Sequence, residues 1–188
     1  MKVFKTSLID CLILKPDIFQ DDRGFFLETF RSNQFAQDTG ILDTFIQDNH
    51  SHSSRGVLRG LHFQSENPQG KLVRASRGSI LDVAVDLRIG SRTFGHSEVF
   101  ELSAQNCHQV WVPPGFAHGF LVLSDFADFQ YKCTQYYDPS DEQAIHWQDP
   151  DLNIPWPVGI ERIVSSKDSN AQSFKEYCDQ VGSKNPRS

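Results

Sequence analysis

The strongest constraint on the fold of this chain is a two-residue alternation of apolar and polar side chains in short segments. In residues 79–87, positions 81, 83, 85 and 87 are Leu or Val, whereas Asp82 and Asp86 lie on the opposite face. This period predicts a half-buried β-strand, because successive side chains of a strand point to opposite faces. Residues 129–134 alternate in the same way, and further short strands are expected over residues 58–64, 71–73, 99–102, 109–112 and 119–123. Many short strands separated by turns rich in Gly and Pro are typical of a β-sandwich or a β-barrel.

The length of 188 residues favours a single domain over residues 1–188, since domains commonly have ~100–200 residues. Helical patterns are sparse. Ser32 is expected to cap a short helix that ends at Gly40. A second helix is expected over residues 169–181, followed by a polar, disordered tail over residues 182–188.

Composition limits the class of protein. The hydrophobic content of 38% and the charged content of 22% fit a soluble globular chain, and no apolar run approaches the ~18 residues of a membrane helix. Asp10 interrupts the short apolar run at the N-terminus, so we expect no signal peptide and a cytoplasmic location. The net charge of −6 argues against a nucleic-acid partner. The four scattered cysteines favour reduced thiols over a disulfide framework or a zinc site.

The segment 58–64 reads Leu-Arg-Gly-Leu-His-Phe-Gln and places two ionisable groups in an apolar strand. Arg59 and His62 must be solvated, paired with another group or engaged in binding or catalysis, because an unpartnered buried charge is costly. In strict alternation the two side chains face opposite ways. Both side chains can line one cavity only if Gly60 marks a bulge or a bend, so this interpretation predicts an irregularity of the strand at Gly60.

A metal site is one explanation of the histidines. The pattern Pro113-x-Gly115-x-x-His118 resembles the second sequence motif of the cupin barrels, in which the His often binds a metal. The first cupin motif needs His-x-His and a Glu shortly after it. Residues 50–52 supply only the two histidines. Because a non-haem iron site needs two His and one carboxylate on a common face, we expect no metal and no other cofactor.

Proton transfer is a second explanation. Histidine side chains ordinarily titrate near neutral pH, so His62 suits a general base, although a core histidine bonded to a backbone carbonyl is the simpler alternative. Tyr131 is a candidate general acid or a packing residue. Lys71 is a candidate for stabilising an oxyanion, or a surface lysine.

Other polar residues leave similar alternatives open. Arg23 follows two aspartates and precedes a glycine, so a turn ion pair competes with a phosphate contact. Glu28 follows Phe26-Leu27, and Gln47 and Asn49 follow Ile46, as either ligand contacts or ordinary residues at strand ends. Residue chemistry alone does not decide between these alternatives.

Taken together, the motifs resemble the dTDP-4-dehydrorhamnose 3,5-epimerase family. The similarity runs from about residue 4 to residue 156 and, more weakly, to Asp168. The motifs that carry it are Asp-Arg-Gly-Phe-Phe-x-Glu at 22–28, Gln-Asp-Asn-His-Ser at 47–51, residues 58–64, Gln-Gly-Lys-Leu-Val at 69–73, Pro-Gly-Phe-Ala-His-Gly-Phe at 114–120, Tyr-Lys at 131–132 and Tyr-Tyr-x-Pro at 136–139.

This resemblance implies a mostly β, cupin-like jelly roll with a few short peripheral helices. It also implies a homodimer that exchanges strands between its subunits, and a dTDP-4-dehydro-6-deoxy-D-glucose substrate. Placed on the matching positions, His62 is the base, Tyr131 the proton donor, Asp168 the carboxylate that orients the base and Lys71 the cation near the C4 oxygen of the sugar. The implied substrate contacts are Arg23, Glu28, Gln47, Asn49, Arg59, His118, Glu142 and Lys167.

The chemistry agrees with the resemblance. Carbons beside a ketone lose protons only when the enolate oxygen is stabilised, so such an enzyme needs a base, a proton donor and a cation. Redox chemistry is not required, and the sequence has no GxGxxG dinucleotide motif. The alternatives are an epimerase acting at C3 or C5 alone, a non-catalytic cupin-like protein that binds nucleotide sugars and, last, a metal-dependent cupin oxygenase.

Overall fold

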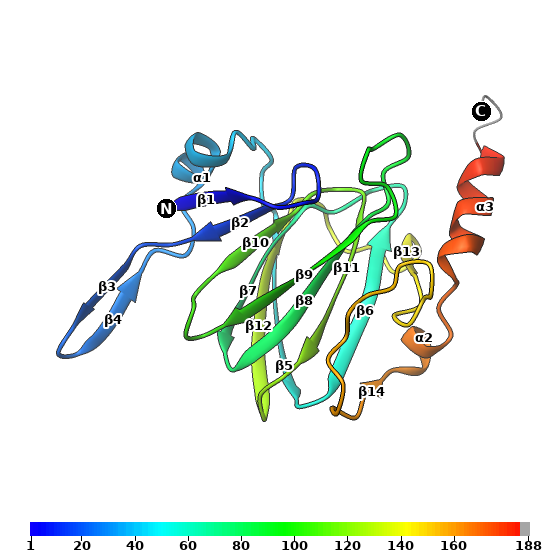
Figure 1. Cartoon of the computed structure of the whole chain (residues 1–188). Helices are drawn as coiled ribbons and strands as arrows, with labels where there is room; N and C mark the ends of the chain where they lie inside the picture. The colour runs from blue at the N-terminus through cyan, green and yellow to red at the C-terminus, as the bar shows by residue number, and fades with distance from the viewer. Residues whose placement is uncertain (185–188) are drawn as a thin grey trace.

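The computed structural model describes residues 1–184, and its centre consists of two antiparallel sheets that face each other (Figure 1). The first sheet contains, in spatial order, β1 (Lys2–Lys5), β2 (Leu12–Lys15), β10 (Gln109–Val112), β7 (Lys71–Arg77), β12 (Phe126–Cys133) and β5 (Gln47–Ser54). The second contains β13 (Glu142–Ala144), β6 (Val57–Gln64), β11 (Phe116–Val122), β8 (Ser79–Asp86) and β9 (Ser97–Ser103), and the short β14 (Ile163–Val164) pairs in parallel with β6.

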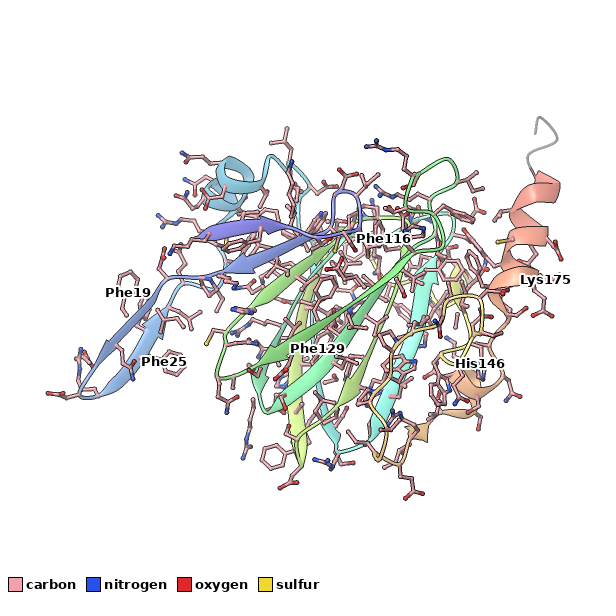
Figure 2. All side chains as sticks on the ribbon, viewed as in Figure 1. Phe19, Phe25, Phe116, Phe129, His146 and Lys175 are labelled. Atoms are coloured by element: carbon pink, nitrogen blue, oxygen red, sulfur yellow. The ribbon has the colours of Figure 1, made fainter. Side chains whose placement is uncertain are left out.

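Apolar side chains from both sheets fill the space between them. Phe129 and Val73 of the first sheet belong to the same buried cluster as Phe120 and Ile80 of the second. Figure 2 shows Phe129 and Phe116 in this interior. The arrangement confirms the expected mostly β fold of two packed sheets, which burial of the alternating apolar faces stabilises.

The strand β8 is covered on both faces. Val83 and Val85 belong to a second apolar cluster that includes Tyr177 of the C-terminal helix α3 (Phe174–Lys184). On the opposite face, Asp82 and Asp86 are also fully buried. The prediction of a half-buried strand is therefore wrong here, because an outer layer covers the face that the aspartates did not occupy.

A two-stranded hairpin, β3 (Ile18–Asp21) and β4 (Gly24–Leu27), extends away from the two sheets (Figure 1). It pairs with neither of them. Its aromatic side chains are largely exposed, and Figure 2 shows Phe19 and Phe25 projecting from it. An isolated hairpin of two strands is marginally stable in water, so this segment has an unpartnered apolar surface.

The first helix is close to the expectation. α1 spans Ser32–Thr39, and the left-handed Gly40 (φ 76°) ends it as predicted. Ser32 is the first helical residue instead of the cap. Arg31 occupies the cap position and makes no capping hydrogen bond with its side chain.

The C-terminal segment forms two helices instead of one. α2 spans Ser166–Ser169, and α3 begins at Phe174. Ser173 and Glu176 exchange the hydrogen bonds of a capping box: the Ser173 amide and hydroxyl donate to Glu176, whose amide donates back to the Ser173 hydroxyl. This Ser-x-x-Glu signal is present in the sequence and starts the helix at this point.

The disordered tail is predicted to start at residue 182, which is too early. Residues 182–184 continue α3, because extending an established helix by a few residues costs little. The remainder of the predicted tail, residues 185–188, lies outside the described residues. Among the helices of residues 1–184, none combines the length and the hydropathy that crossing a membrane requires.

Candidate active site

The site is built around a bend in β6. Gly60 has φ 114°, and the register between β6 and β11 shifts at this point. A Cβ atom on Gly60 would lie 2.6 Å from the carbonyl oxygen of His118, so only glycine fits. The bend lets Arg59 and His62 line the same cavity of about 520 Å³. The expected bulge at Gly60 is therefore confirmed.

His62 is held by a buried carboxylate. Its Nε2 atom lies 2.6 Å from Oδ1 of Asp168, whose side chain is 4% exposed. The hydroxyl of Ser165 caps α2 by accepting from the Asp168 amide and so fixes the start of this helix. Burial raises the pKa of Asp168, but the hydrogen bond to His62 and smaller contributions lower it below the usual value. An ionised Asp168 thus orients the imidazole of His62.

Lys71 lies in the same cavity at the start of β7 and is buried. Burial lowers the pKa of its ammonium group, and the nearby Cys133, Glu142 and Asp82 partly oppose this effect. Within residues 1–184, no salt bridge engages Lys71. Its charge is therefore available for a ligand oxygen.

Tyr131 belongs to the first sheet, whereas His62 belongs to the second, so the two side chains enter the cavity from opposite walls. The ring of Tyr131 packs against Phe129, with centroids 5.4 Å apart. Burial raises the pKa of its hydroxyl, which keeps it protonated near neutral pH. An acid and a base therefore face one another across the cavity.

Three further predicted contacts line this cavity: Arg59, His118 and Lys167. The guanidinium of Arg59 donates to the Ser53 hydroxyl at 3.1 and 3.3 Å. Lys167 donates to Glu142, and Glu142 also accepts from the Tyr137 hydroxyl at 2.8 Å. The Oε1 atom of Glu142 lies 3.7 Å from Nδ1 of His62, so Glu142 belongs to the same polar group.

Gln47 and Asn49 lie next to the cavity on β5. The amide of Gln47 donates to the Asn49 side chain at 3.1 Å, and Asn49 is the cross-strand partner of Tyr131. Gln47 also accepts from the Tyr137 amide at 2.9 Å. Both amides therefore border the cavity without lining it.

Arg23 and Glu28 are the two predicted residues that the chain does not bring to its own cavity. The side chain of Arg23, at the tip of the hairpin, is 90% exposed and forms a turn ion pair with Asp21 at 2.5 Å. Glu28 follows β4 and binds Arg31 at 2.9 Å. Within one chain, these residues are outside the site.

The sequence reasoning missed two residues near the cavity. Asp82 accepts from Nε2 of His118 at 2.8 Å inside the barrel, and Tyr137 binds Glu142 at its border. The two-residue alternation predicts a solvent-facing side chain for Asp82, and Tyr137 is part of the Tyr-Tyr-x-Pro motif without a predicted role. The histidines at 50 and 52 lie on the exposed face of β5, away from the cavity.

Comparisons with known proteins agree with this geometry. Residues 5–176 match the family model described as dTDP-4-dehydrorhamnose 3,5-epimerase. A relative of that name from Pseudomonas aeruginosa is 48% identical, over 94% of this chain and 97% of the relative. Another from Neisseria gonorrhoeae is 54% identical over 94% of this chain, which spans only 53% of that longer protein.

A solved structure is equally similar. The dTDP-6-deoxy-D-glucose-3,5-epimerase of Legionella pneumophila, in complex with dTDP-4-keto-L-rhamnose, matches with a TM-score of 0.93 and 47% identity over 96% of both chains. This match confirms the expected cupin-like jelly roll.

Proposed function

Because the chain belongs to the dTDP-4-dehydrorhamnose 3,5-epimerase family, we propose that it epimerises dTDP-4-dehydro-6-deoxy-D-glucose at C3 and C5. The observation that carries the proposal is the pair of opposed proton-transfer groups. His62, held by Asp168, enters the cavity from one wall, and Tyr131 enters from the other. Inverting a carbon requires this arrangement, because the proton leaves one face and another arrives on the opposite face.

The reaction begins when His62 removes a proton from the carbon beside the C4 ketone. With Nε2 bonded to Asp168, the Nδ1 atom is the nitrogen available for this step. The C–H bond breaks, its electron pair forms the enolate, and the charge moves to the C4 oxygen. The Lys71 ammonium stabilises that oxygen, and the buried carboxylate of Asp168 stabilises the imidazolium.

Tyr131 completes the inversion by donating its proton to the opposite face of the same carbon. The pKa of its hydroxyl, raised by burial, keeps that proton in place until the basic enolate forms. Once His62 has released its proton to solvent and the Tyr131 phenolate has regained one, the same steps at the second carbon give the doubly epimerised product. No cofactor is needed, because both protons are transferred by side chains.

The remaining polar side chains bind the nucleotide sugar. Arg59 and Lys167 place positive charge at the cavity for the diphosphate, and His118 lies deeper inside with the sugar groups. Gln47, Asn49 and Glu142 border the opening. The nucleotide sugar is thus the proposed partner. The absence of a nucleic-acid or membrane partner and a cytoplasmic location stay predictions from the sequence.

A second copy of the chain supplies the missing contacts in this proposal. The hairpin β3–β4 has exposed aromatic side chains and no sheet of its own to pack on, and it presents Arg23 at its tip. A homodimer in which each hairpin covers the partner's cavity would bury these side chains. It would also bring Arg23 and Glu28 to a substrate.

An epimerase that acts at one carbon is the alternative, because the same base, donor and cation serve either carbon. Incubating the protein with substrate in heavy water distinguishes the two. Deuterium at both C3 and C5 supports the proposed reaction, and deuterium at one carbon supports the alternative. Absence of label would contradict an epimerase and favour a binding protein.

A further inference from the structure

Two fully buried aspartates lie four residues apart on β8, and their environments differ sharply. Asp82 and Asp86 are each 0% exposed. Both side chains project from the same face of the strand, because side chains alternate with a period of two residues and these two positions are four residues apart. A buried carboxylate is costly unless hydrogen bonds and countercharges satisfy it, so each needs an explanation.

Asp86 is explained by the local fold. Its two oxygens accept from the Arg88 guanidinium and from the hydroxyls of Ser91 and Thr93, at 2.6 to 3.0 Å. Despite burial, these hydrogen bonds lower the pKa of Asp86 to about 2. Asp86 therefore fixes the turn after β8, and its role is structural.

Asp82 has no comparable set of partners. Its Oδ1 atom accepts from Nε2 of His118 at 2.8 Å, and its Oδ2 atom is buried without a hydrogen-bond partner among residues 1–184. The side chain lies in the barrel interior, on the same face of β8 as the apolar Ile80 and Ala84. For stability alone, this carboxylate is a poor choice, because an apolar residue of similar volume would fill the position at lower cost.

His118 connects Asp82 to the cavity. It is the cross-strand partner of His62 between β11 and β6, and it lines the same cavity. Its ring stacks on Phe129, with centroids 5.9 Å apart and planes 15° apart, and Phe129 in turn packs against Tyr131. The ring is thus fixed in its plane by Phe129 and in its direction by Asp82.

We infer that Asp82 is a positioning residue for the sugar end of the cavity: it holds His118 with the proton on Nε2, so that Nδ1 accepts a hydrogen bond from a sugar hydroxyl. The inference rests on the proposed function for the identity of the ligand. A carboxylate accepts only, so it selects the Nε2–H tautomer and leaves the other nitrogen as an acceptor. In this interpretation His62, held by Asp168, transfers the proton, whereas His118, held by Asp82, binds and orients the sugar.

The charge of Asp82 has a second effect. It raises the pKa of Lys71, against the larger lowering by burial, so it helps to keep the ammonium protonated. Neutralising Asp82 therefore weakens both a sugar contact and the cation at the C4 oxygen. Asp86 offers no such link, since its partners lie in the turn after β8.

The two aspartates provide a matched pair for a test. Asp82→Asn and Asp82→Leu should retain or raise the melting temperature, because each removes a poorly satisfied buried charge. Both should lower kcat/KM by roughly ten- to a hundredfold, with a higher KM from the lost sugar contact and a lower kcat from the weakened Lys71 charge. Asp86→Asn should show the reverse: a lower melting temperature with kcat/KM of the folded enzyme within about twofold of the wild type. If the Asp82 variants lose stability and keep their KM, the inference is wrong.

Nitrogen-15 NMR of the histidine side chains tests the tautomer directly. The resonances of His118, assigned with a His118→Gln variant, should show a neutral ring with its proton on Nε2. In Asp82→Leu that preference should be lost. A proton on Nδ1, or on both nitrogens in the wild-type protein, would overturn the inference.

This measurement needs no substrate, so its outcome is independent of whether the protein epimerises the proposed sugar. If the wild-type protein fails to label C3 and C5 in heavy water, the proposed function fails whatever the tautomer. If labelling succeeds and the Asp82 variants match the wild type in KM, the proposed function stands and only the positioning role fails.

Discussion

Two His–Asp pairs with almost the same contact distance lie in different regions of this molecule. His62 is 2.6 Å from Asp168 inside the barrel, and His52 is 2.5 Å from Asp128 on the outer face of the first sheet. In both pairs the histidine lowers the pKa of the carboxyl group. Neither the distance nor the direction of the pKa shift therefore identifies an active site.

The surroundings make the difference. Asp168 is almost fully buried, and His62 shares its cavity with a lysine and a tyrosine from the facing sheet. His52 is 60% exposed, stacks on the ring of Phe126, and shares its carboxylate with His50, whose Nε2 lies 3.7 Å from Asp128. A proton-transfer pair needs a cavity in which nearby groups stabilise the charge that develops on a bound substrate, whereas the outer pair lies on the exposed face of β5, outside the cavity of His62. Each prediction below tests this contrast.

The largest effect is expected from removing the inner base. His62→Ala should lower epimerisation and deuterium exchange at C3 and C5 by ~10³-fold or more, because no other group replaces a positioned general base. His52→Ala is the control and should stay within about twofold of the wild type, since its ion pair is exposed. Deuterium incorporation into the substrate, followed by NMR, measures the activity of both variants. Substantial exchange in His62→Ala would remove that residue from the base role.

Removing the donor on the facing wall should separate two steps. Tyr131→Phe should reduce net epimerisation by ~10²-fold while proton loss from the substrate falls less, because His62 and Lys71 remain. The ratio of deuterium exchange with retained configuration to net inversion reports the difference. An equal fall in both rates would place Tyr131 outside the donor role.

A smaller effect is expected at the tip of the hairpin. Arg23→Ala should weaken kcat/KM by about tenfold, as expected for loss of an exposed charge contact to a phosphate. If the hairpins cross between subunits, dissociating this variant and His62→Ala and letting them reassociate together should restore activity. Half of the dimers are then mixed, and each mixed dimer has one site with both His62 and the partner's Arg23 intact. About one site in four should therefore be active. Mixing without recovery, in a sample shown by light scattering to be dimeric, would contradict the exchange.

The smallest effect concerns stability against pH. The folded-state pKa of Asp168 is lowered, so its contribution to stability is complete above the unfolded value of ~3.9 and is lost as the pH falls through the folded value. When the pH is lowered below about 4, the melting temperature of Asp168→Asn should fall by a few degrees less than that of the wild type. Asp128→Asn should change it less, because solvent screens the outer pair. Equal slopes in the two variants would show that burial does not distinguish the pairs.

Much of the framework follows from the sequence. The alternation in residues 79–87 and 129–134 places strands where they occur, and the polar island at Arg59 and His62 requires the bend found at Gly60. These inferences succeed because they depend on local geometry and on the cost of burying charge.

Most of the wrong predictions share one physical cause, which is a covering surface that the local sequence does not reveal. Asp82 was placed on a solvent-facing side because a single strand does not reveal that its second face is covered. The predicted contacts of Arg23 and Glu28 need a surface that one chain does not supply. Ser173 and Glu176 differ from these cases, since their capping signal is local and was present in the sequence.

The bend in β6 also limits which substitutions this protein can accept. A Cβ on Gly60 would lie 2.6 Å from the carbonyl oxygen of His118, and a Cβ on Gly119 would lie 2.6 Å from that of Arg59. Each glycine thus makes room for the backbone opposite, and replacing either one forces the strands apart beneath the base. Libraries that seek new sugar specificity should therefore vary the cavity rim and leave these two positions untouched, because no single side chain is tolerated at either.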